Sequence, residues 1–183
     1  MNYHKIEKTS VANGPGVRVV LWVSGCSLHC KGCHNPQTWD FNSGQFFDEA
    51  AKQELFDALS KPYIQGITFS GGHPLEPQNS KEVLSLIKEI KDKFPAKDIW
   101  LYTGYTFEEI CERYCNQAFY NLYKNAKEPN VWSNIQYVDV LVDGPYIESQ
   151  RDITLPFRGS KNQRLIDVKE TLKQNKIIQY KIN

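Results

Sequence analysis

The stretch VRVVLWVSGCSLHCKGCHN, residues 17–35, decides how this chain is organised. Residues 17–23 are apolar except for Arg18 and contain four valines, which predicts a buried strand of a parallel sheet. Arg18, near the start of this strand, could pair with an acidic side chain at the surface. The strand leads directly into a loop that carries three cysteines.

The cysteines of this loop, Cys26, Cys30 and Cys33, have the spacing Cys-x3-Cys-x2-Cys, and no fourth cysteine lies close by in the sequence. Three thiolates can hold three corners of a four-iron cluster and leave the fourth iron open. A metal site with one open position is suited to chemistry, as in catalytic sites that keep a vacancy for water or substrate. The spacing therefore predicts a catalytic iron–sulfur cluster.

Structural zinc is the alternative for these cysteines, with His29 or His34 as the fourth ligand. Zinc knuckles usually combine paired Cys-x2-Cys units, and only one such unit is present here, so the spacing favours a cluster. His29 lies between two of the cysteines and is expected to face solvent or to brace the loop. His34 as an iron ligand would close the open position, so we do not expect it to bind iron.

A second element of interest is SGGHPL, residues 70–75, because its two glycines follow the short apolar run GITFS at residues 66–70. Glycines at the end of a strand let the backbone approach a ligand closely. A lone Gly-Gly pair is more often an ordinary turn. This pair comes about forty residues after the cysteines, at the end of the next predicted strand, and that position favours a binding role.

Strand and helix patterns alternate along the rest of the chain. Further strands are predicted at 66–70, 98–102, 137–142 and 176–182, and helices at 48–60 with Asp48 as cap, from Asn79 or Ser80 to about Lys93, after a cap at Thr106, and at 165–174. This order predicts an α/β fold with a mainly parallel sheet and flanking helices. The cysteine loop and the Gly71-Gly72 loop should then share the rim where the strands end.

Length and composition favour one domain over residues 1–183. Residues 114–136 have no clear period and indicate an insertion. Cys111 and Cys115, four residues apart, are expected to be a packed pair.

A net charge of +1 without a basic tract predicts no nucleic-acid partner, and no apolar run approaches the roughly 20 residues of a membrane helix. Five cysteines and no signal-peptide pattern indicate a cytoplasmic protein with metal or redox chemistry.

The cysteine spacing and the Gly-Gly element together resemble the radical S-adenosylmethionine (SAM) superfamily. The resemblance implies an incomplete β/α barrel in which Cys26, Cys30 and Cys33 bind one [4Fe-4S] cluster, while SAM chelates the open iron. It implies no catalytic side chain, because the cluster splits SAM into methionine and a 5′-deoxyadenosyl radical. The implied SAM contacts are Gly32, Cys33, His34, Gly71, Gly72 and His73.

His73 stands where this superfamily usually has an acidic residue. A carboxylate contact to the amino group of SAM is therefore not expected at this position. The main-chain carbonyl groups of Gly71 and Gly72 can still accept hydrogen bonds from that amino group.

An ordered series of segments resembles the activating proteins of anaerobic ribonucleoside-triphosphate reductases: NGPGVR (13–18), NPQTW (35–39), GQ (44–45), LEPQN (75–79), DIWLYTG (98–104), LVDG (141–144) and FRGSKNQR (157–164). This resemblance implies an oxidoreductase that forms a glycyl radical on the large subunit of the reductase. It also implies an electron donor, of which flavodoxin is the usual one in the family.

Other functions stay open at this point. Enzymatic alternatives are the activation of a different glycyl-radical enzyme and another small radical SAM reaction, such as modification of a nucleoside. The non-enzymatic alternative is a zinc-stabilised binding module. Iron and sulfide content separates the module from the enzymes, and a glycyl radical on the reductase separates the enzymes from each other.

Overall fold

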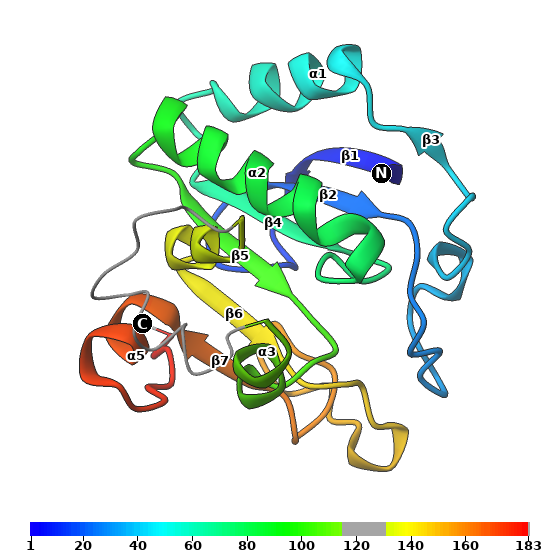
Figure 1. Ribbon diagram of the computed structural model, residues 1–183, viewed down its shortest axis with the longest axis vertical. Coiled ribbons are helices and arrows are strands. Elements are labelled where there is room, and N and C mark those ends of the chain that lie inside the picture. Colours follow the sequence, from blue (N-terminus) through cyan, green and yellow to red (C-terminus); the bar gives the residue numbers. More distant parts are fainter. Residues whose placement is uncertain (115–130, 183) are drawn as a thin grey trace.

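The computed structural model describes residues 1–114 and 131–182 and consists of a twisted sheet with flanking helices (Figure 1). Seven strands follow one another across the sheet in the order β3-β1-β2-β4-β5-β6-β7. They are β1 (Asn2–Ser10), β2 (Arg18–Val23), β3 (Gln45–Phe46), β4 (Gly66–Gly71), β5 (Asp98–Tyr102), β6 (Val140–Asp143) and β7 (Arg164–Asp167). The predicted α/β class is confirmed.

The middle of the sheet is parallel. Strand β2 pairs with β4, β4 with β5, and β5 with β6, all in parallel register. Both sides of this parallel block are finished by antiparallel strands, β1 and β3 on one side and β7 on the other. The predicted mainly parallel sheet is thus confirmed for its centre, whereas the antiparallel borders were not expected from the sequence.

The helices are α1 (Glu49–Leu59), α2 (Pro77–Lys93), α3 (Phe107–Tyr114) and α5 (Val168–Gln174), with the short 3₁₀ helices η1 (Pro36–Thr38), η2 (Val131–Tyr137) and η3 (Glu148–Gln150). Two predicted caps are confirmed: the Asp48 carboxylate accepts a hydrogen bond from the amide of Ala51, and the Thr106 hydroxyl accepts one from Glu109. No helix in the described parts of the chain has the length and apolarity to cross a bilayer.

The predicted start of α2 at Asn79 or Ser80 is wrong. The helix begins at Pro77, with Glu76 at the N-cap position. Proline fits the first helical position because the amide hydrogen that it lacks would have no partner there. The Asn79 side chain does not cap the helix. It donates hydrogen bonds to the carbonyl oxygens of Ser24 and His73, at 2.8 and 3.2 Å.

The C-terminal part also differs from the prediction. Residues 164–167 form strand β7, and helix α5 starts only at Val168, because the Asp167 carboxylate caps it by accepting from the amide of Glu170. The strand predicted at 176–182 is reduced to a single bridge between Ile166 and Gln179. Cys115 and most of the predicted insertion lie outside the described residues; Val131–Tyr137 form η2, and Asn134 donates to a carbonyl oxygen of α2.

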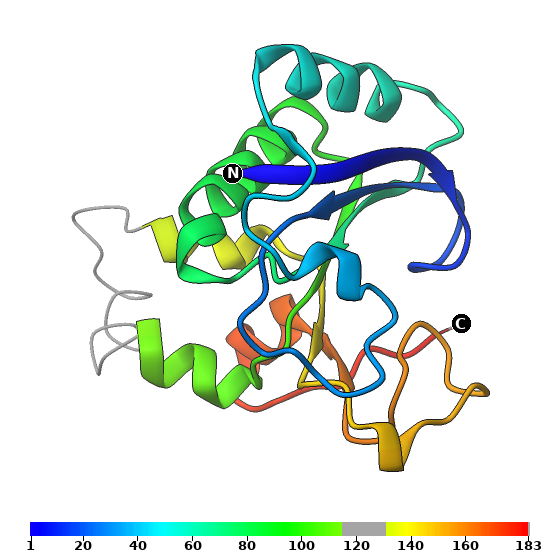
Figure 2. The same ribbon diagram turned by 90° about the vertical axis from the view of Figure 1, so that its right-hand side faces the viewer.

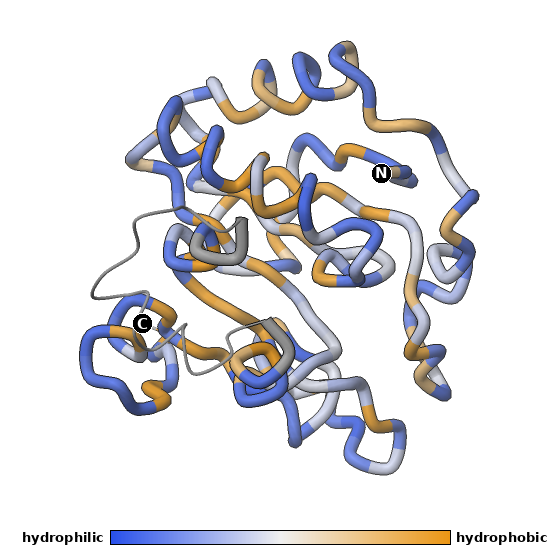
Figure 3. Tube along the Cα trace, viewed as in Figure 1, coloured by the Kyte–Doolittle hydropathy of each residue, from blue (hydrophilic) through white to orange (hydrophobic). Residues whose placement is uncertain are grey.

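The two faces of the sheet carry different layers. Alternate residues of the central strands, such as Leu21, Phe69 and Leu101, pack in the large core beneath the helices. The residues between them face the opposite side, where a smaller cluster surrounds Trp100 and Val142. Figure 2 shows α2 and α3 to one side of the sheet and the segment 144–163 with the C-terminal end to the other. Figure 3 shows the central strands as the most hydrophobic part of the chain.

Arg18 is fully buried, so the expectation of a surface ion pair is corrected. Its guanidinium hydrogen-bonds Thr68 at 2.8 Å and the carbonyl oxygen of Ile67 at 3.1 Å, and it forms an ion pair with Asp98 at 2.5 Å. The sequence pattern missed this burial because the acid that pairs with Arg18 lies 80 residues further along the chain.

Candidate functional site

The cysteine loop follows β2 at the end of the parallel block. Cys26 is buried, and Cys30 and Cys33 are partly buried, with all three thiols free. The start of the loop is held by η1 and its neighbour, because the amide of Gly25 donates to Thr38 at 2.7 Å and the amide of Cys26 to Trp39 at 3.0 Å. These main-chain bonds fix the path of the chain into the first cysteine.

His29 lies between Cys26 and Cys30 in the left-handed backbone region, with φ of 44°. Its ring stacks on Trp39 with 4.6 Å between the ring centres. The contact joins the tip of the loop to the segment after η1. His29 is also exposed, so the expectation that it faces solvent or braces the loop is confirmed in both forms.

Backbone amides point at two of the sulfur atoms. Burial raises the pKa of the Cys26 thiol, and amide hydrogen bonds from Leu28 and His29 oppose that rise. The amide of Asn35 lies 3.4 Å from the sulfur of Cys33. Amides directed at sulfur stabilise negative charge there, which is what a thiolate bound to iron carries.

The Gly-Gly loop lies against the cysteine loop, backbone to backbone. The amide of Gly72 donates to the carbonyl oxygen of Val23, and the amide of His73 donates to that of Gly25, both at 2.8 Å. A Cβ atom at Gly71 would come within 2.6 Å of the Val23 oxygen, and one at Gly72 within 2.5 Å of the Gly25 oxygen. Both glycines are therefore needed for the ends of β2 and β4 to meet this closely.

His73 is buried and uses both of its ring nitrogens. Nδ1 lies 3.0 Å from the carboxylate of Glu76, and Nε2 lies 2.8 Å from the hydroxyl of Thr103. The Glu76 carboxylate also accepts a 2.8 Å hydrogen bond from the hydroxyl of Ser27. Burial raises the pKa of Glu76, but the hydrogen bonds from His73 and Ser27 outweigh it and hold that pKa below its usual value, so Glu76 is an anion at neutral pH.

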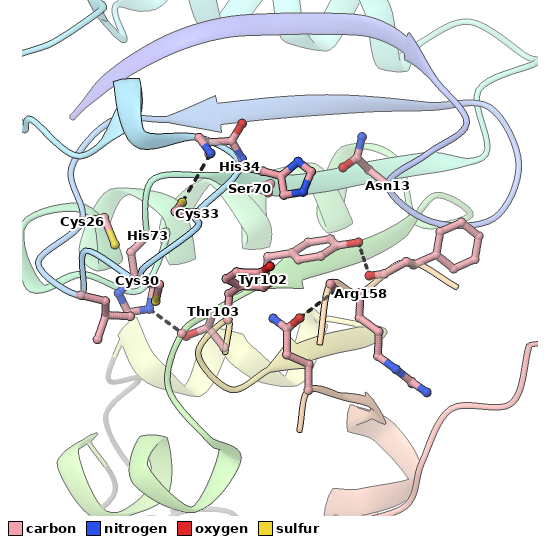
Figure 4. Close-up of a pocket in the computed structure, with 18 of the residues that line it drawn as sticks. Asn13, Cys26, Cys30, Cys33, His34, Ser70, His73, Tyr102, Thr103 and Arg158 are labelled. Atoms are coloured by element: carbon pink, nitrogen blue, oxygen red, sulfur yellow. Dashed lines mark hydrogen bonds between the residues drawn. The ribbon is translucent and has the colours of Figure 1, made fainter. Parts of the chain in front are cut away.

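A cavity of about 560 Å³ opens between the cysteine loop, the Gly-Gly loop and the segment 144–163 (Figure 4). Its volume lies in the range of small-molecule and cofactor sites. The predicted site residues that line it are Cys26, Cys30, Cys33, His34, Gly71, Gly72 and His73. The structure thus brings together two segments that the sequence analysis placed on one rim.

Gly32 is the one predicted site residue that does not line this cavity. It has φ of +77°, and a Cβ atom there would come within 3.0 Å of the Glu148 carboxylate and 3.2 Å of the Tyr146 ring. The neighbouring Lys31 forms an exposed ion pair with Glu148 at 3.2 Å. Gly32 therefore faces the segment around η3, where it lets two loops pass closely.

The far wall of the cavity was not predicted. It contains Trp22 and Tyr102 from the strands, and from the segment 144–163 it contains Tyr146, Arg151, Asp152, Ile153, Leu155, Phe157, Arg158, Gly159 and Gln163. The hydroxyl of Tyr102 donates to the carbonyl oxygen of Phe157 at 2.6 Å and so ties this segment to β5. Burial raises the pKa of Tyr102, which keeps the hydroxyl protonated as a donor. The segment FRGSKNQR was the available signal for this wall.

Three free thiols that line one cavity are a donor set of the kind that binds an iron–sulfur cluster. Within residues 1–114 and 131–182, no three His, Cys, Asp or Glu side chains converge on a point that could hold one metal ion. A zinc ion needs its sulfur ligands about 2.3 Å from one centre. In a four-iron cluster each thiolate binds a different iron, so the three sulfur atoms need not meet at one point.

Comparison with known proteins agrees with this site. Residues 12–166 match a family described as "4Fe-4S single cluster domain". The chain is 44% identical to the anaerobic ribonucleoside-triphosphate reductase-activating protein of Enterobacteria phage T4, over 90% of this chain and 93% of the relative. The proteins of the same name from Escherichia coli K12 and Haemophilus influenzae are 40% and 39% identical, each over 89% of this chain and 96% of the relative. The chain therefore belongs to the family of anaerobic ribonucleoside-triphosphate reductase-activating proteins.

Proposed function

We propose that this protein activates an anaerobic ribonucleoside-triphosphate reductase by forming a glycyl radical on its large subunit. The observation that carries the proposal is the shared cavity, whose lining includes Cys26, Cys30 and Cys33 together with the Gly-Gly loop. Membership of the activating-protein family supports the identity of the target. The protein acts as a radical SAM oxidoreductase in this proposal.

Cys26, Cys30 and Cys33 hold one [4Fe-4S] cluster as its three protein ligands. A cluster bound there would supply the electron for reductive cleavage of SAM, which is the chemistry needed to remove a hydrogen atom from a glycine Cα of the reductase. The amides of Leu28, His29 and Asn35 stabilise the thiolates. The Cys26 thiol must lose its proton to bind iron; its burial opposes this loss, and the amides of Leu28 and His29 assist it.

SAM occupies the cavity beside the cluster. Its proposed contacts are Gly32, Cys33, His34, Gly71, Gly72 and His73. The main chain supplies most of them, because the two glycines bring backbone to the cavity wall and the ring nitrogens of His73 already have protein partners. Gly32 belongs to this set only if its loop turns toward the cavity when SAM binds.

The proposed domain is an incomplete β/α barrel that spans residues 1–183, with residues 114–136 as an insertion. Four parallel strands at the centre of an open sheet support this arrangement. An incomplete barrel leaves one side open for the glycine-bearing segment of the large subunit. A flavodoxin is the proposed electron donor, and the free thiols suit a reducing cytoplasm.

Anaerobic reconstitution with iron and sulfide tests the proposal. The protein should take up about four irons per chain, and with SAM and a reductant it should release 5′-deoxyadenosine. Addition of the large reductase subunit should then produce the doublet of a glycyl radical in electron paramagnetic resonance. A colourless protein that retains zinc would refute the enzyme. Cleavage of SAM without a doublet on the reductase would point to a different target.

A further inference from the structure

A chain of polar contacts, formed by Ser27, Glu76, His73 and Thr103, is buried at His73 and reaches the cysteine loop at Ser27 (Figure 4 shows its His73–Thr103 link). His73 and Glu76 are 1% and 6% exposed, so the chain is shielded from water along most of its length. The four residues come from four different places: the cysteine loop, the N-cap of α2, the Gly-Gly loop and the end of β5. We call these residues the polar chain.

At the centre of the polar chain, every side-chain nitrogen of His73 and every carboxylate oxygen of Glu76 has a hydrogen-bond partner. The imidazole of His73 has one partner at each nitrogen, so it has no free nitrogen to bind iron or to reach a ligand. The Glu76 carboxylate divides its two oxygen atoms between the cysteine loop and His73, with Oε1 on the Ser27 hydroxyl and Oε2 on His73. Hydrogen bonds to a buried carboxylate are among the stronger ones in proteins.

The outer end of the polar chain lies directly beside a proposed iron ligand. Ser27 follows Cys26 in the sequence, and besides its hydroxyl its amide points at Glu76 from 3.4 Å. The other end reaches the hydroxyl of Thr103, which also accepts from the amide of Tyr105 at 3.1 Å. The chain thus joins the first cysteine to the end of a neighbouring strand on the far side of the Gly-Gly loop.

We propose that His73 and Glu76 are positioning residues that set the cysteine loop, through Ser27, at a fixed distance from the Gly-Gly loop. In this role His73 does not touch SAM with its side chain. It instead holds Glu76 in the place from which the carboxylate anchors the loop. The effect of this positioning on catalysis rests on the proposed function, because the cysteine loop would hold the cluster and the Gly-Gly loop would contact SAM.

Ser27→Ala tests the positioning role with little risk to folding, since Ser27 is exposed. Loss of the hydroxyl should loosen the loop, and the buried Cys26 thiol of the apoprotein should react with iodoacetamide about tenfold faster, as expected for the loss of one strong hydrogen bond. Mass spectrometry of the alkylated peptide measures the rate. Ser27→Thr keeps the hydroxyl and should restore the wild-type rate.

Ser80→Ala is the matched control, because Ser80 is a buried hydroxyl in the first turn of α2 that bonds only within its own helix. It should leave the Cys26 alkylation rate unchanged. Glu76→Gln keeps the volume of the side chain but loses its charge, and it should accelerate alkylation as Ser27→Ala does. Wild-type alkylation rates in both Ser27→Ala and Glu76→Gln would overturn the proposal.

A second measurement uses the reconstituted protein. Ser27→Ala should bind as much iron as wild type, while its Kd for SAM rises several-fold and the SAM-induced change in the resonance spectrum of the reduced cluster becomes smaller. Thermal midpoints equal to wild type would show that the effect is local. An unchanged Kd and an unchanged spectrum would show that the position of the cysteine loop does not affect SAM binding.

The two proposals fail in different ways. If wild type binds iron but releases no 5′-deoxyadenosine, the proposed function is wrong, and the alkylation rates of the apoprotein still decide whether the polar chain positions the loop. If wild type is active and both variants alkylate at its rate, only the positioning role is wrong.

Discussion

Arg18 and Asp98 form an ion pair across an intervening strand. In the register of the sheet Arg18 is opposite Gly66 on β4, and Gly66 is opposite Asp98 on β5. A Cβ atom at Gly66 would come within 2.2 Å of the Asp98 carboxylate oxygen. The glycine therefore leaves the space in which a fully buried guanidinium reaches an acid two strands away.

Arg18→Met should strongly destabilise the protein. The variant keeps most of the volume but leaves the Asp98 carboxylate without its cation and Thr68 without its donor. Breaking a fully buried pair in this way costs about 3–5 kcal/mol, and the partial exposure of Asp98 places the expected loss at the lower end of that range. Equilibrium unfolding in urea measures the change. Lys8→Ala, which breaks an exposed ion pair with Glu54, is the control and should cost less than about 1 kcal/mol. Equal losses in the two variants would contradict the argument.

Cys30→Ser should abolish cluster binding. Serine removes one of the three proposed thiolates, so the iron content should fall from about four per chain toward zero, and release of 5′-deoxyadenosine should stop. Cys111→Ser is the matched control, because Cys111 lies on α3 and is absent from the cavity lining. It should retain iron and activity. Full iron content in Cys30→Ser would refute the ligand assignment.

Gly71→Ala should disturb the site more than Gly144→Ala does. Both glycines have positive φ, +105° and +91°, so each alanine is strained by about 1–2 kcal/mol. Only at Gly71 would the new Cβ also collide with the Val23 carbonyl oxygen; at Gly144 the nearest atom is 3.5 Å away. Urea unfolding and SAM binding should both show the difference. Similar affinities for SAM in the two variants would count against the proposed role of the Gly-Gly loop.

Acid should weaken the fold through carboxylates whose native pKa values are low. Hydrogen bonds from Arg164 lower the pKa of Glu108. At Glu76 burial raises the pKa, but the hydrogen bonds from His73 and Ser27 together have the larger effect, so the native pKa lies below the usual value. Each contribution to stability is complete above the unfolded glutamate pKa of about 4.3 and is lost as the pH falls through the lower native value. The midpoint temperature of thermal unfolding should therefore decrease when the pH is lowered below about 4. In Glu108→Gln this decrease should be smaller. An unchanged acid slope in the variant would exclude Glu108 as a contributor.

Tyr102→Phe should loosen the far wall of the cavity. The variant removes the 2.6 Å hydrogen bond to the Phe157 carbonyl oxygen while it keeps the ring. Amide hydrogen exchange in residues 153–160 should become about fivefold faster or more, as expected from about 1 kcal/mol of lost local stability. Exchange in the core strand β4 should not change. Wild-type exchange in both regions would show that other contacts hold this segment.

The sequence predicted those parts of the fold whose causes are local. Buried apolar runs gave β2, β4 and β5, and polar side chains next to a periodic helix gave the caps Asp48 and Thr106. Strand β1 was missed because NYHKIEKTS mixes charged and polar residues and has no continuous apolar run, and its pairing with β2 and β3 depends on tertiary contacts. The boundary of α5 was misplaced because an apolar strand and an apolar helix turn look alike over so few residues.

The near wall of the site was predictable and the far wall was not. Three cysteines and two glycines each follow a strand, so the parallel topology alone places them on one rim. The residues around Phe157 reach the same cavity from more than 80 residues beyond the Gly-Gly loop, held by a hydroxyl-to-carbonyl bond that no sequence spacing indicates. The burial of His73 between Glu76 and Thr103 depends in the same way on the packing of separate strand ends.

Strand β2 has a paired neighbour on each side, β1 and β4, so the segment that delivers the cysteines does not lie at a border of the sheet. Its main-chain pairing on both sides is made by protein strands, in contrast to small domains that fold only around zinc. If oxygen destroyed the cluster, the apoprotein would then stay folded, and a cell could rebuild the cluster in the same molecule from iron and sulfide instead of synthesising a new one.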